Sequence, residues 1–537
     1  MLNSQNLAFA IKTAIKKNHK FFALFVVVYC VILVAFSRYA PNLDDLGYFA
    51  FIYQNRIDFF TEYGGGNPAD GRFNAFAFLD LLFLMQISKS PYLFFGFNAL
   101  LFAIFSALFL KILNISNGKS TLNALITALL SISIGFVIAF FGICYLEKIQ
   151  IIWIAIFMLC TFFVLQKPTQ TNQLLGIIAL NIALYYKEPL FASAIAFGVI
   201  LLLYARQNSR KDLQKYALLV ICSALLYVLL YVLLVLVFAN IIKYYGFNVV
   251  SDIWECVISD SIVVFSVCGV VAFRAHLVIF RKEKIEAFFD GFLCASFAYF
   301  AVFAVLKIST PYYLLPCYVF GIPSLLYFGR KYFCNIFIKI VLFLGLFGFL
   351  AQNLPSGIHK MIDLKAQGVQ FHRTLDFVAS HLKENKDAKI FFEGIGSDLL
   401  IYGAEALFYA SWFDEYLHIM YGAQSPKGGR LRAETKCYYD SYYCLRQGTP
   451  KSGDLIIANN KSALGNALSV AQNRGELIYQ SGFPTIPKIA LMPFVRYFFS
   501  DSSPVAKNDK AKKTAESTPN NTNYFALPCE TYVFKVR

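Results

Sequence analysis

Long apolar segments separated by short polar connectors dominate this chain, and they constrain its fold more than any other feature. Of 537 residues, 58% are hydrophobic and only 15% are charged, a far more apolar balance than that of soluble domains. Many of the apolar segments approach or exceed the length that crosses the hydrocarbon core of a bilayer. The sequence therefore predicts an α-helical polytopic membrane protein with the lipid bilayer as its surroundings.

The positions of Lys and Arg indicate which side of the membrane each connector faces. Residues 1–20 contain four lysines and one histidine but no acid, which predicts a cytoplasmic N-terminus because basic connectors stay inside. If the stretch 73–113 makes one net crossing, the most basic connectors fall on the cytoplasmic side, whereas two crossings would invert them. The net charge of +16 thus reflects Lys and Arg residues that set the orientation of the chain in the membrane, and it does not indicate a nucleic-acid partner.

This count predicts about eleven crossings within residues 21–352. The predicted crossings are 21–37, one within 73–113, 122–143, 149–166, 174–186, 189–205, 217–240, 261–280, 288–306, 312–329 and 333–351. The abundance of Lys, Asn, Phe and Ile hints at an AT-rich bacterial genome, and hence at a multi-pass protein of the inner (plasma) membrane.

Residues 353–537 differ from the rest and predict a small extracytoplasmic α/β domain. A helix is expected over 359–385 and another over 461–472. Strands are expected at 389–393, 454–458, 477–480 and 531–536. The low-complexity stretch 501–523 predicts a disordered insertion. The spacing of Cys437 and Cys444 permits a disulfide without requiring one.

The first outward loop, 38–73, contains the adjacent carboxylates Asp44 and Asp45. One interpretation is that an aspartate caps the following helix. The alternative is catalytic: two neighbouring carboxylates repel each other, which raises one pKa as a general base requires. Arg72, later in the loop, is either an interfacial arginine or a clamp for phosphate oxygens. Arg56 is a weaker candidate for the same role.

Three further features lie on the predicted outer side. Glu147 and Lys148 lie in the tight connector between two crossings, where the pair is either a solvated surface feature or part of a site. Lys187, Glu188 and Pro189 interrupt an apolar stretch, so these charges lie at an interface or line a wet cavity, and the proline breaks the helix. The third feature is the tyrosine pair at residues 312 and 313, which belongs to an aromatic belt or stacks on a sugar ring.

Other groups receive less weight. Arg274 and His276, within 261–280, are interpreted as snorkelling or helix-packing groups. The chain contains no Cys/His metal-ligand spacing, no phosphate-binding glycine loop and no G-x-S-x-G sequence. Chemistry with nucleotide donors on the cytoplasmic side therefore lacks support.

The layout of these motifs over roughly residues 20–350 resembles that of the multispanning C-type fold (GT-C) glycosyltransferases. This group includes the protein O-mannosyltransferases and the aminoarabinose transferase of lipid A. The resemblance rests on the acid pair Asp44 and Asp45, on Arg72, on the acidic turn at Glu147 and on the charged break at 187–189. The glycine cluster at 64–66 departs from the pattern.

The resemblance implies a polyprenyl-phosphate-linked sugar donor and an acceptor glycan, lipid or protein on the outer side. Asp44 or Asp45 would deprotonate the acceptor hydroxyl, and Arg72 and Lys187 would hold the donor phosphate. Glu147 would orient the acceptor or a cation. Direct displacement would invert the anomeric carbon. No cofactor is firmly implied, although a divalent cation bound by Asp44 and Asp45 is compatible with the resemblance.

Three rival functions remain open from sequence. A lipid or oligosaccharide flippase would share the broken helix, but it predicts acids near the midplane and internal repeats, which are not visible here. A surface-polysaccharide polymerase or ligase is a neighbouring enzyme class. A scaffold would act only through its exported domain.

Overall fold

A computed structural model describes most of the apolar part of the chain. The described residues are 20–39, 73–236, 260–306, 311–385, 388–392, 413, 417, 420, 436–437, 450–459, 473–481 and 531–537. Several predicted features lie outside them: Asp44, Asp45, Arg56 and Arg72, the helix expected over 461–472, and the insertion 501–523. The chain divides into two compact units, one of residues 1–34, 57–84 and 94–358, the other of residues 35–56, 85–93 and 359–537.

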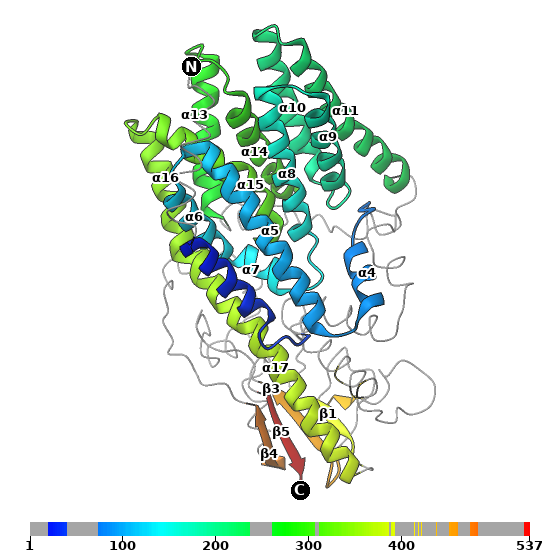
Figure 1. Cartoon of the computed structure of the whole chain (residues 1–537). Coiled ribbons are helices and arrows are strands. Elements are labelled where there is room, and N and C mark those ends of the chain that lie inside the picture. The colour runs from blue at the N-terminus through cyan, green and yellow to red at the C-terminus, as the bar shows by residue number, and fades with distance from the viewer. Residues whose placement is uncertain are drawn as a thin grey trace, which may run out of the picture. The chain divides into compact units, whose positions relative to one another are not determined.

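Helices make up nearly all of the first unit (Figure 1). They are α4 (Leu79–Ile87), α5 (Pro91–Asn117), α6 (Ser120–Ser131), α7 (Ile134–Phe141), α8 (Glu147–Gln166), α9 (Gln170–Leu184), α10 (Leu190–Gln207), α11 (Lys211–Tyr231), α13 (Cys268–Ile279), α14 (Ala287–Leu306), α15 (Leu315–Lys331) and α16 (Ile336–Gly348). The π-helical turns η2 (Val232–Leu236), η4 (Ile262–Val267) and η6 (Phe349–Asn353) and the 3₁₀ turn η5 (Pro311–Leu314) adjoin them. Helix α17 (Leu354–Glu384) continues from η6 into the second unit.

Eight helices among the described residues are long and apolar enough to cross a membrane, so the predicted polytopic helical class is confirmed at this level. The stretch 73–113 holds the nine-residue α4 and most of α5, of which only α5 is long enough to cross. Two predicted crossings coincide with shorter helices, Lys20–Val34 and α9.

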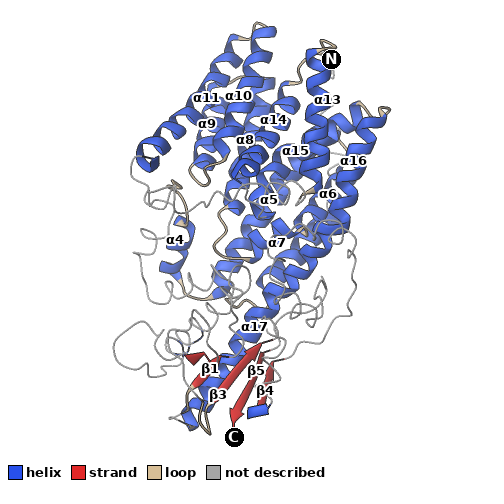
Figure 2. Ribbon diagram, turned by 180° about the vertical axis from the view of Figure 1, so that it is seen from behind, coloured by secondary structure: helices blue, strands red, loops and turns tan. Residues whose placement is uncertain are grey.

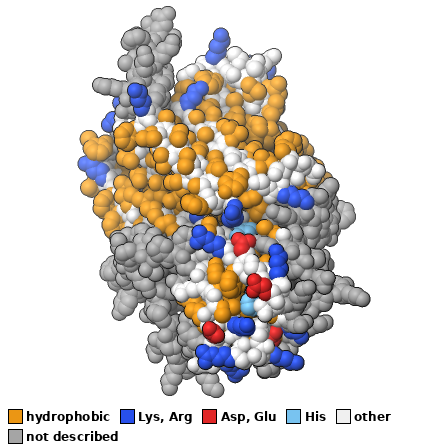
Figure 3. Space-filling view, turned by 60° about the horizontal axis from the view of Figure 1, so that its bottom comes forward, with side chains coloured by type: hydrophobic (Ala, Val, Ile, Leu, Met, Phe, Trp, Pro, Cys, Tyr) orange, Lys and Arg blue, Asp and Glu red, His pale blue; other side chains and the backbone are white. Residues whose placement is uncertain are grey.

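The helices differ in how much of their surface other helices cover. Helix α15 is the most enclosed, with 78% of its apolar window buried, whereas α11 has only 22% buried. Apolar side chains cover much of the described outer surface of the helices (Figure 3). Phe343 and Phe347, for example, project outward from α16. A helix that is apolar all round and only partly covered by protein is suited to lipid contact.

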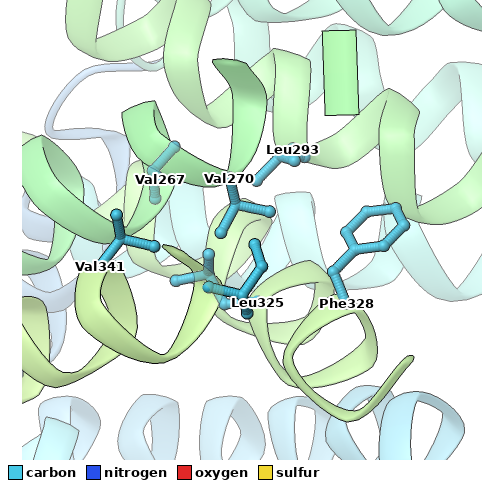
Figure 4. Close-up of a cluster of buried hydrophobic side chains, with 7 residues drawn as sticks. Val267, Val270, Leu293, Leu325, Phe328 and Val341 are labelled. Atoms are coloured by element: carbon cyan, nitrogen blue, oxygen red, sulfur yellow. The ribbon is translucent and has the colours of Figure 1, made fainter. Parts of the chain in front are cut away.

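A cluster of aliphatic and aromatic side chains joins η4, α13, α14, α15 and α16 (Figure 4). Its buried members are Val267, Val270, Leu293, Leu325, Phe328, Ile338 and Val341. Small residues lie where these elements come close together. Ser261 and Ser266 donate hydrogen bonds to the carbonyls of Gly345 and Val341, both at 3.0 Å. Small and hydroxylated residues at contacts are a general feature of helix packing in membranes.

A network of charged groups extends this cluster. Arg274 of α13 is 3% exposed and donates hydrogen bonds to both carboxylate oxygens of Asp290, at 2.8 and 2.7 Å. It also pairs with Glu283 at 3.1 Å and lies over the ring of Phe328. The prediction that Arg274 packs against other helices is confirmed, and the snorkelling alternative is wrong because the guanidinium is enclosed by protein partners.

The stretch 122–143, predicted as one crossing, is a bent pair. Helices α6 and α7 meet at Ile132–Ser133 with an angle of 67°. The Ser131 and Ser133 hydroxyls donate to the carbonyls of Thr127 and Leu130, both at 2.7 Å, which is how serine satisfies backbone groups near a break. Gly357 lies against the break, because a Cβ there would stand 1.8 Å from the Ile132 carbonyl oxygen.

Gly357→Ala is therefore expected to lower the free energy of unfolding by about 1–3 kcal/mol, the usual cost of overpacking. The backbone oxygen cannot rotate away as a flexible side chain would. Denaturant titration of the purified protein in detergent measures the change. The matched control is Gly96→Ala in α5, where a Cβ meets nothing within 4 Å and the greater helix propensity of alanine favours stability. An equal change in the free energy of unfolding for the two variants would contradict the close approach at Gly357.

The second unit contains a five-stranded sheet (Figure 2). The strands are β1 (Ile390–Phe392), β2 (Lys436–Cys437), β3 (Leu455–Asn459), β4 (Gly475–Ser481) and β5 (Thr531–Val536), in the order β2-β1-β3-β5-β4. Strand β1 is parallel to β2 and β3, and β5 is antiparallel to β3 and β4. All four strands predicted from sequence are present. The helix predicted over 359–385 is present as part of α17, whose Phe377 stacks on Tyr479 of β4 with ring centroids 4.5 Å apart.

Candidate functional site

The charged break between α9 and α10 brings two predicted site residues together. Helix α9 ends at Leu184 and α10 begins at Leu190, after Pro189. The connector between them places the Nζ atom of Lys187 2.9 Å from the Oε1 atom of Glu147. Because Glu147 is the first residue of α8, this ion pair joins the start of one helix to the gap between two others.

The ion pair is almost fully enclosed. The side chains of Glu147 and Lys187 are 1% and 10% exposed. Burial lowers the pKa of the Lys187 ammonium, but the adjacent Glu147 carboxylate outweighs that effect, so this pKa lies above its ordinary value. Lys187 therefore carries its charge throughout the physiological pH range. A fixed, dehydrated positive charge of this kind interacts strongly with an anionic group that reaches it.

Tyrosine rings form one wall of this site. The Lys187 ammonium lies 3.9 Å from the ring centroid of Tyr313, a cation–π contact. Tyr312 packs edge-on against Tyr313 and Tyr145, with centroid distances of 4.5 and 4.6 Å. Phe303 of α14 stacks on the other ring, Tyr313, at 5.2 Å. These contacts hold the tyrosine pair against the ion pair, so an aromatic belt facing lipid does not account for both rings.

Gln150 fixes the shape of the connector. Its amide Nε2 donates to the carbonyls of Ala183 and Lys187, at 3.3 and 3.5 Å. Its Oε1 accepts a hydrogen bond of 3.4 Å from the hydroxyl of Tyr299 on α14. Both carbonyls also accept backbone hydrogen bonds, from Tyr186 at 3.3 Å and Leu190 at 3.5 Å, so Gln150 reinforces the turns on either side of the break. The position of Lys187 is thus set by α8 and α14 as well as by its own connector.

Lys148 places a second cation beside the first. Its ammonium donates to the carbonyls of Gly142 and Ile143, at 3.3 and 2.7 Å, and it is buried. Asp80 of α4 lies within electrostatic reach: burial raises the pKa of the Asp80 carboxyl, and Lys148 opposes that rise. Lys148 therefore caps the turn that leads into Glu147 and faces an additional carboxylate.

The predicted site residues divide into two groups. Glu147, Lys187, Tyr312 and Tyr313 are brought together in one place. Glu188 follows Lys187, is partly buried and forms no ion pair with any residue that the structure describes. The remaining predicted site residues, the acid pair Asp44 and Asp45 with Arg56 and Arg72, lie outside the described residues.

Sequence reasoning missed Asp80 and Gln150, and it named Lys148 beside Glu147 without a role in the site. One signal was available for Asp80, because a carboxylate within the apolar run of α4 is the kind of intramembrane or interfacial charge that marks a site. The partners of Gln150 come from segments far away in the chain, so no local sequence pattern predicts them. In the described part of the chain no three His, Cys, Asp or Glu side chains are grouped to hold a metal ion.

A second polar cluster lies on neighbouring elements of the same unit. The Asp260 carboxylate accepts hydrogen bonds from the Tyr318 hydroxyl, from the Asn353 amide at 3.2 Å and from the Val263 backbone amide at 3.0 Å. The side chains of Asp260, Tyr318 and Asn353 are all buried. The cluster ties the start of η4 and the end of η6 to α15, the helix that follows the tyrosine pair.

No protein-family model matches this chain, and no curated protein sequence matches it. The functional argument therefore depends on the site itself.

Proposed function

We propose that this protein is a membrane glycosyltransferase that moves a sugar from a polyprenyl-phosphate donor to an extracytoplasmic glycan, lipid or protein acceptor, with inversion. The buried ion pair of Glu147 and Lys187, placed at a helix break and backed by Tyr313, is the observation that carries the proposal. In this proposal the chain crosses the inner membrane about eleven times. Its N-terminus is cytoplasmic, and its α/β domain and the site lie outside.

The site offers a phosphate leaving group what it needs. Cleavage of a glycosyl phosphate concentrates negative charge on the departing phosphate oxygen, and a preorganised cation stabilises that charge most when water is excluded. Lys187 is held by Glu147 and Tyr313 before any ligand arrives, so little reorganisation is required. Arg72 would supply a second, bidentate contact to the phosphate.

The reaction balances as a single displacement. The acceptor oxygen attacks the anomeric carbon as the bond from that carbon to the phosphate oxygen breaks. Asp44 or Asp45 takes the acceptor proton, and polyprenyl phosphate leaves as an anion. One base suffices because phosphate leaves without protonation, whereas glycoside hydrolysis uses a second carboxylic acid. Glu147 fixes the orientation of Lys187, and Glu188 contributes a second carboxylate beside it.

The double variant Asp44→Asn/Asp45→Asn tests the chemistry. Loss of a general base is expected to reduce transfer about 10²–10⁴-fold while the protein accumulates normally in the membrane. Mass comparison of surface glycolipids from cells lacking the protein, and from cells with the wild-type or variant chain, provides the measurement. The control is Asp212→Asn, because Asp212 is an exposed acid paired with Arg210. Glycan masses that do not depend on the protein at all would contradict the proposed function.

A further inference from the structure

Two side-chain oxygens near the ion pair lack hydrogen-bond donors. They are the Oδ1 atoms of Asn74 and Asp80, both shielded from solvent and both without a hydrogen-bond partner. Asn74 is 2% exposed. Buried acceptors in native proteins almost always receive a hydrogen bond, because an unpaired one is destabilising. Two such oxygens close together in the sequence, in a segment that borders the proposed site, point to a ligand that supplies the donors.

The segment that carries them is docked on the connector that carries Lys187. The backbone amide of Phe76 donates to the Tyr185 carbonyl at 3.2 Å. The ring of Phe76 packs against Tyr185 and Tyr186, with centroid distances of 5.7 and 6.2 Å. The Phe73 carbonyl accepts a 2.8 Å hydrogen bond from Tyr227 of α11. Residues 73–80 are therefore held in place independently of any ligand.

Asp80 also faces the groups that flank the ion pair. Its carboxylate interacts electrostatically with Lys148, next to Glu147, and with the hydroxyl of Tyr186, next to Lys187. Asp80 thus belongs to the surroundings of the ion pair, and Asn74 lies in the segment that is docked on the Lys187 connector. A ligand whose phosphate reached Lys187 would need hydrogen-bond donors to satisfy these two oxygens.

We propose that Asn74 and Asp80 bind hydroxyl groups of the donor's sugar ring. This inference rests on the proposed function, because it takes Lys187 as the phosphate site. The sugar carbon is bonded directly to the phosphate oxygen, so the hydroxyls nearest Lys187 belong to the donor and not to the acceptor. A site built to pair with a hydroxyl discriminates strongly against an analogue that lacks it. Asn74 and Asp80 are therefore the residues that determine which sugar is accepted.

The test measures lipid binding to the full chain in nanodiscs by native mass spectrometry. The probes are undecaprenyl phosphate and a panel of undecaprenyl-phosphate pentoses and hexoses. At least one sugar is expected to raise affinity at least about tenfold over the bare phosphate lipid, equivalent to about 1.4 kcal/mol. Asn74→Ala and Asp80→Ala are expected to remove that gain and leave the affinity for undecaprenyl phosphate unchanged.

Three further variants make the result specific. Asp80→Asn preserves shape and serves if Asp80→Ala fails to fold. Ser106→Ala removes another buried hydroxyl without a partner, on α5, and it should leave the sugar preference intact. Lys187→Met should weaken binding of every lipid in the panel. The stability of each lipid-free variant is measured alongside, because Asp80→Ala also removes the carboxylate that interacts with Lys148.

The outcomes separate the inference from the function on which it rests. A sugar preference that survives both alanine substitutions would overturn the inference, as would a panel in which no sugar improves on the bare phosphate. Equal weakening of the bare and sugar-bearing lipids by Asn74→Ala or Asp80→Ala would also overturn it. Undecaprenyl phosphate binding that is indifferent to Lys187→Met would instead contradict the proposed phosphate site.

Discussion

Lys187→Met is expected to abolish sugar transfer and also to destabilise the protein. Loss of a preorganised charge-stabilising group typically costs about 10²–10³-fold in turnover. The substitution also leaves the Glu147 carboxylate buried without its cation, and removal of one partner from a buried pair costs about 3–5 kcal/mol. Transfer in reconstituted membranes measures the first effect, and denaturant titration in detergent measures the second.

The double variant Lys187→Met/Glu147→Gln separates these two effects. Without either charge, most of the lost stability should return, because replacement of a buried ion pair by neutral groups is often close to neutral. Transfer should stay lost. Lys111→Met is the matched control, since Lys111 also lies over an aromatic ring, that of Phe163 at 5.5 Å, but is exposed. Recovery of transfer together with stability would show that Lys187 has only a structural role.

Asp290→Ala is expected to produce the largest loss of stability outside the proposed site. Arg274 would keep Glu283 but lose both hydrogen bonds to Asp290, whose side chain is 8% exposed. Because only the partly exposed Glu283 carboxylate would then balance the buried guanidinium, the free energy of unfolding should fall by about 3 kcal/mol, the lower end of the cost of breaking a buried pair. Transfer at low temperature should persist, because Asp290 begins α14 and Phe303, which stacks on Tyr313, lies near its end.

Glu286→Ala is the companion variant for that measurement. Glu286 pairs with Lys331 at 3.1 Å, and both side chains are about one-third exposed. Water screens such a pair, so its removal should change stability by less than about 1 kcal/mol. A similar loss for Asp290→Ala and Glu286→Ala would mean that the enclosed network around Arg274 contributes no more than a surface pair.

Much of the helical layout follows from sequence because the bilayer sets the length of apolar segments. The break at Lys187–Glu188–Pro189 was predictable, since two charges and a proline cannot continue a buried helix. The bend between α6 and α7 was not predicted. Its local sign is weak, only Ser131, Ser133 and Gly135 within an apolar run, and the residue packed against it, Gly357, comes from far along the chain.

The candidate site was predictable only in part, for the same reason. Glu147 and Lys187 attract attention as charges in apolar surroundings, but their pairing depends on how α8 meets the α9–α10 connector. Arg274 likewise stands out in the sequence as a charge in an apolar segment, but its partner cannot be predicted. Its charge was compatible with both snorkelling and helix packing, because the sequence gives no sign that Asp290 lies opposite it. Local pattern identifies unusual residues, and tertiary packing decides their partners.

The bend at Ile132–Ser133 has a consequence for biosynthesis. The two arms, α6 and α7, are 12 and 8 residues long, so neither is a complete stop for the insertion machinery on its own. The glycine that fits against the corner belongs to the final long helix of the apolar region and leaves the ribosome much later. That corner therefore cannot reach its final packing until the start of α17 has been synthesised.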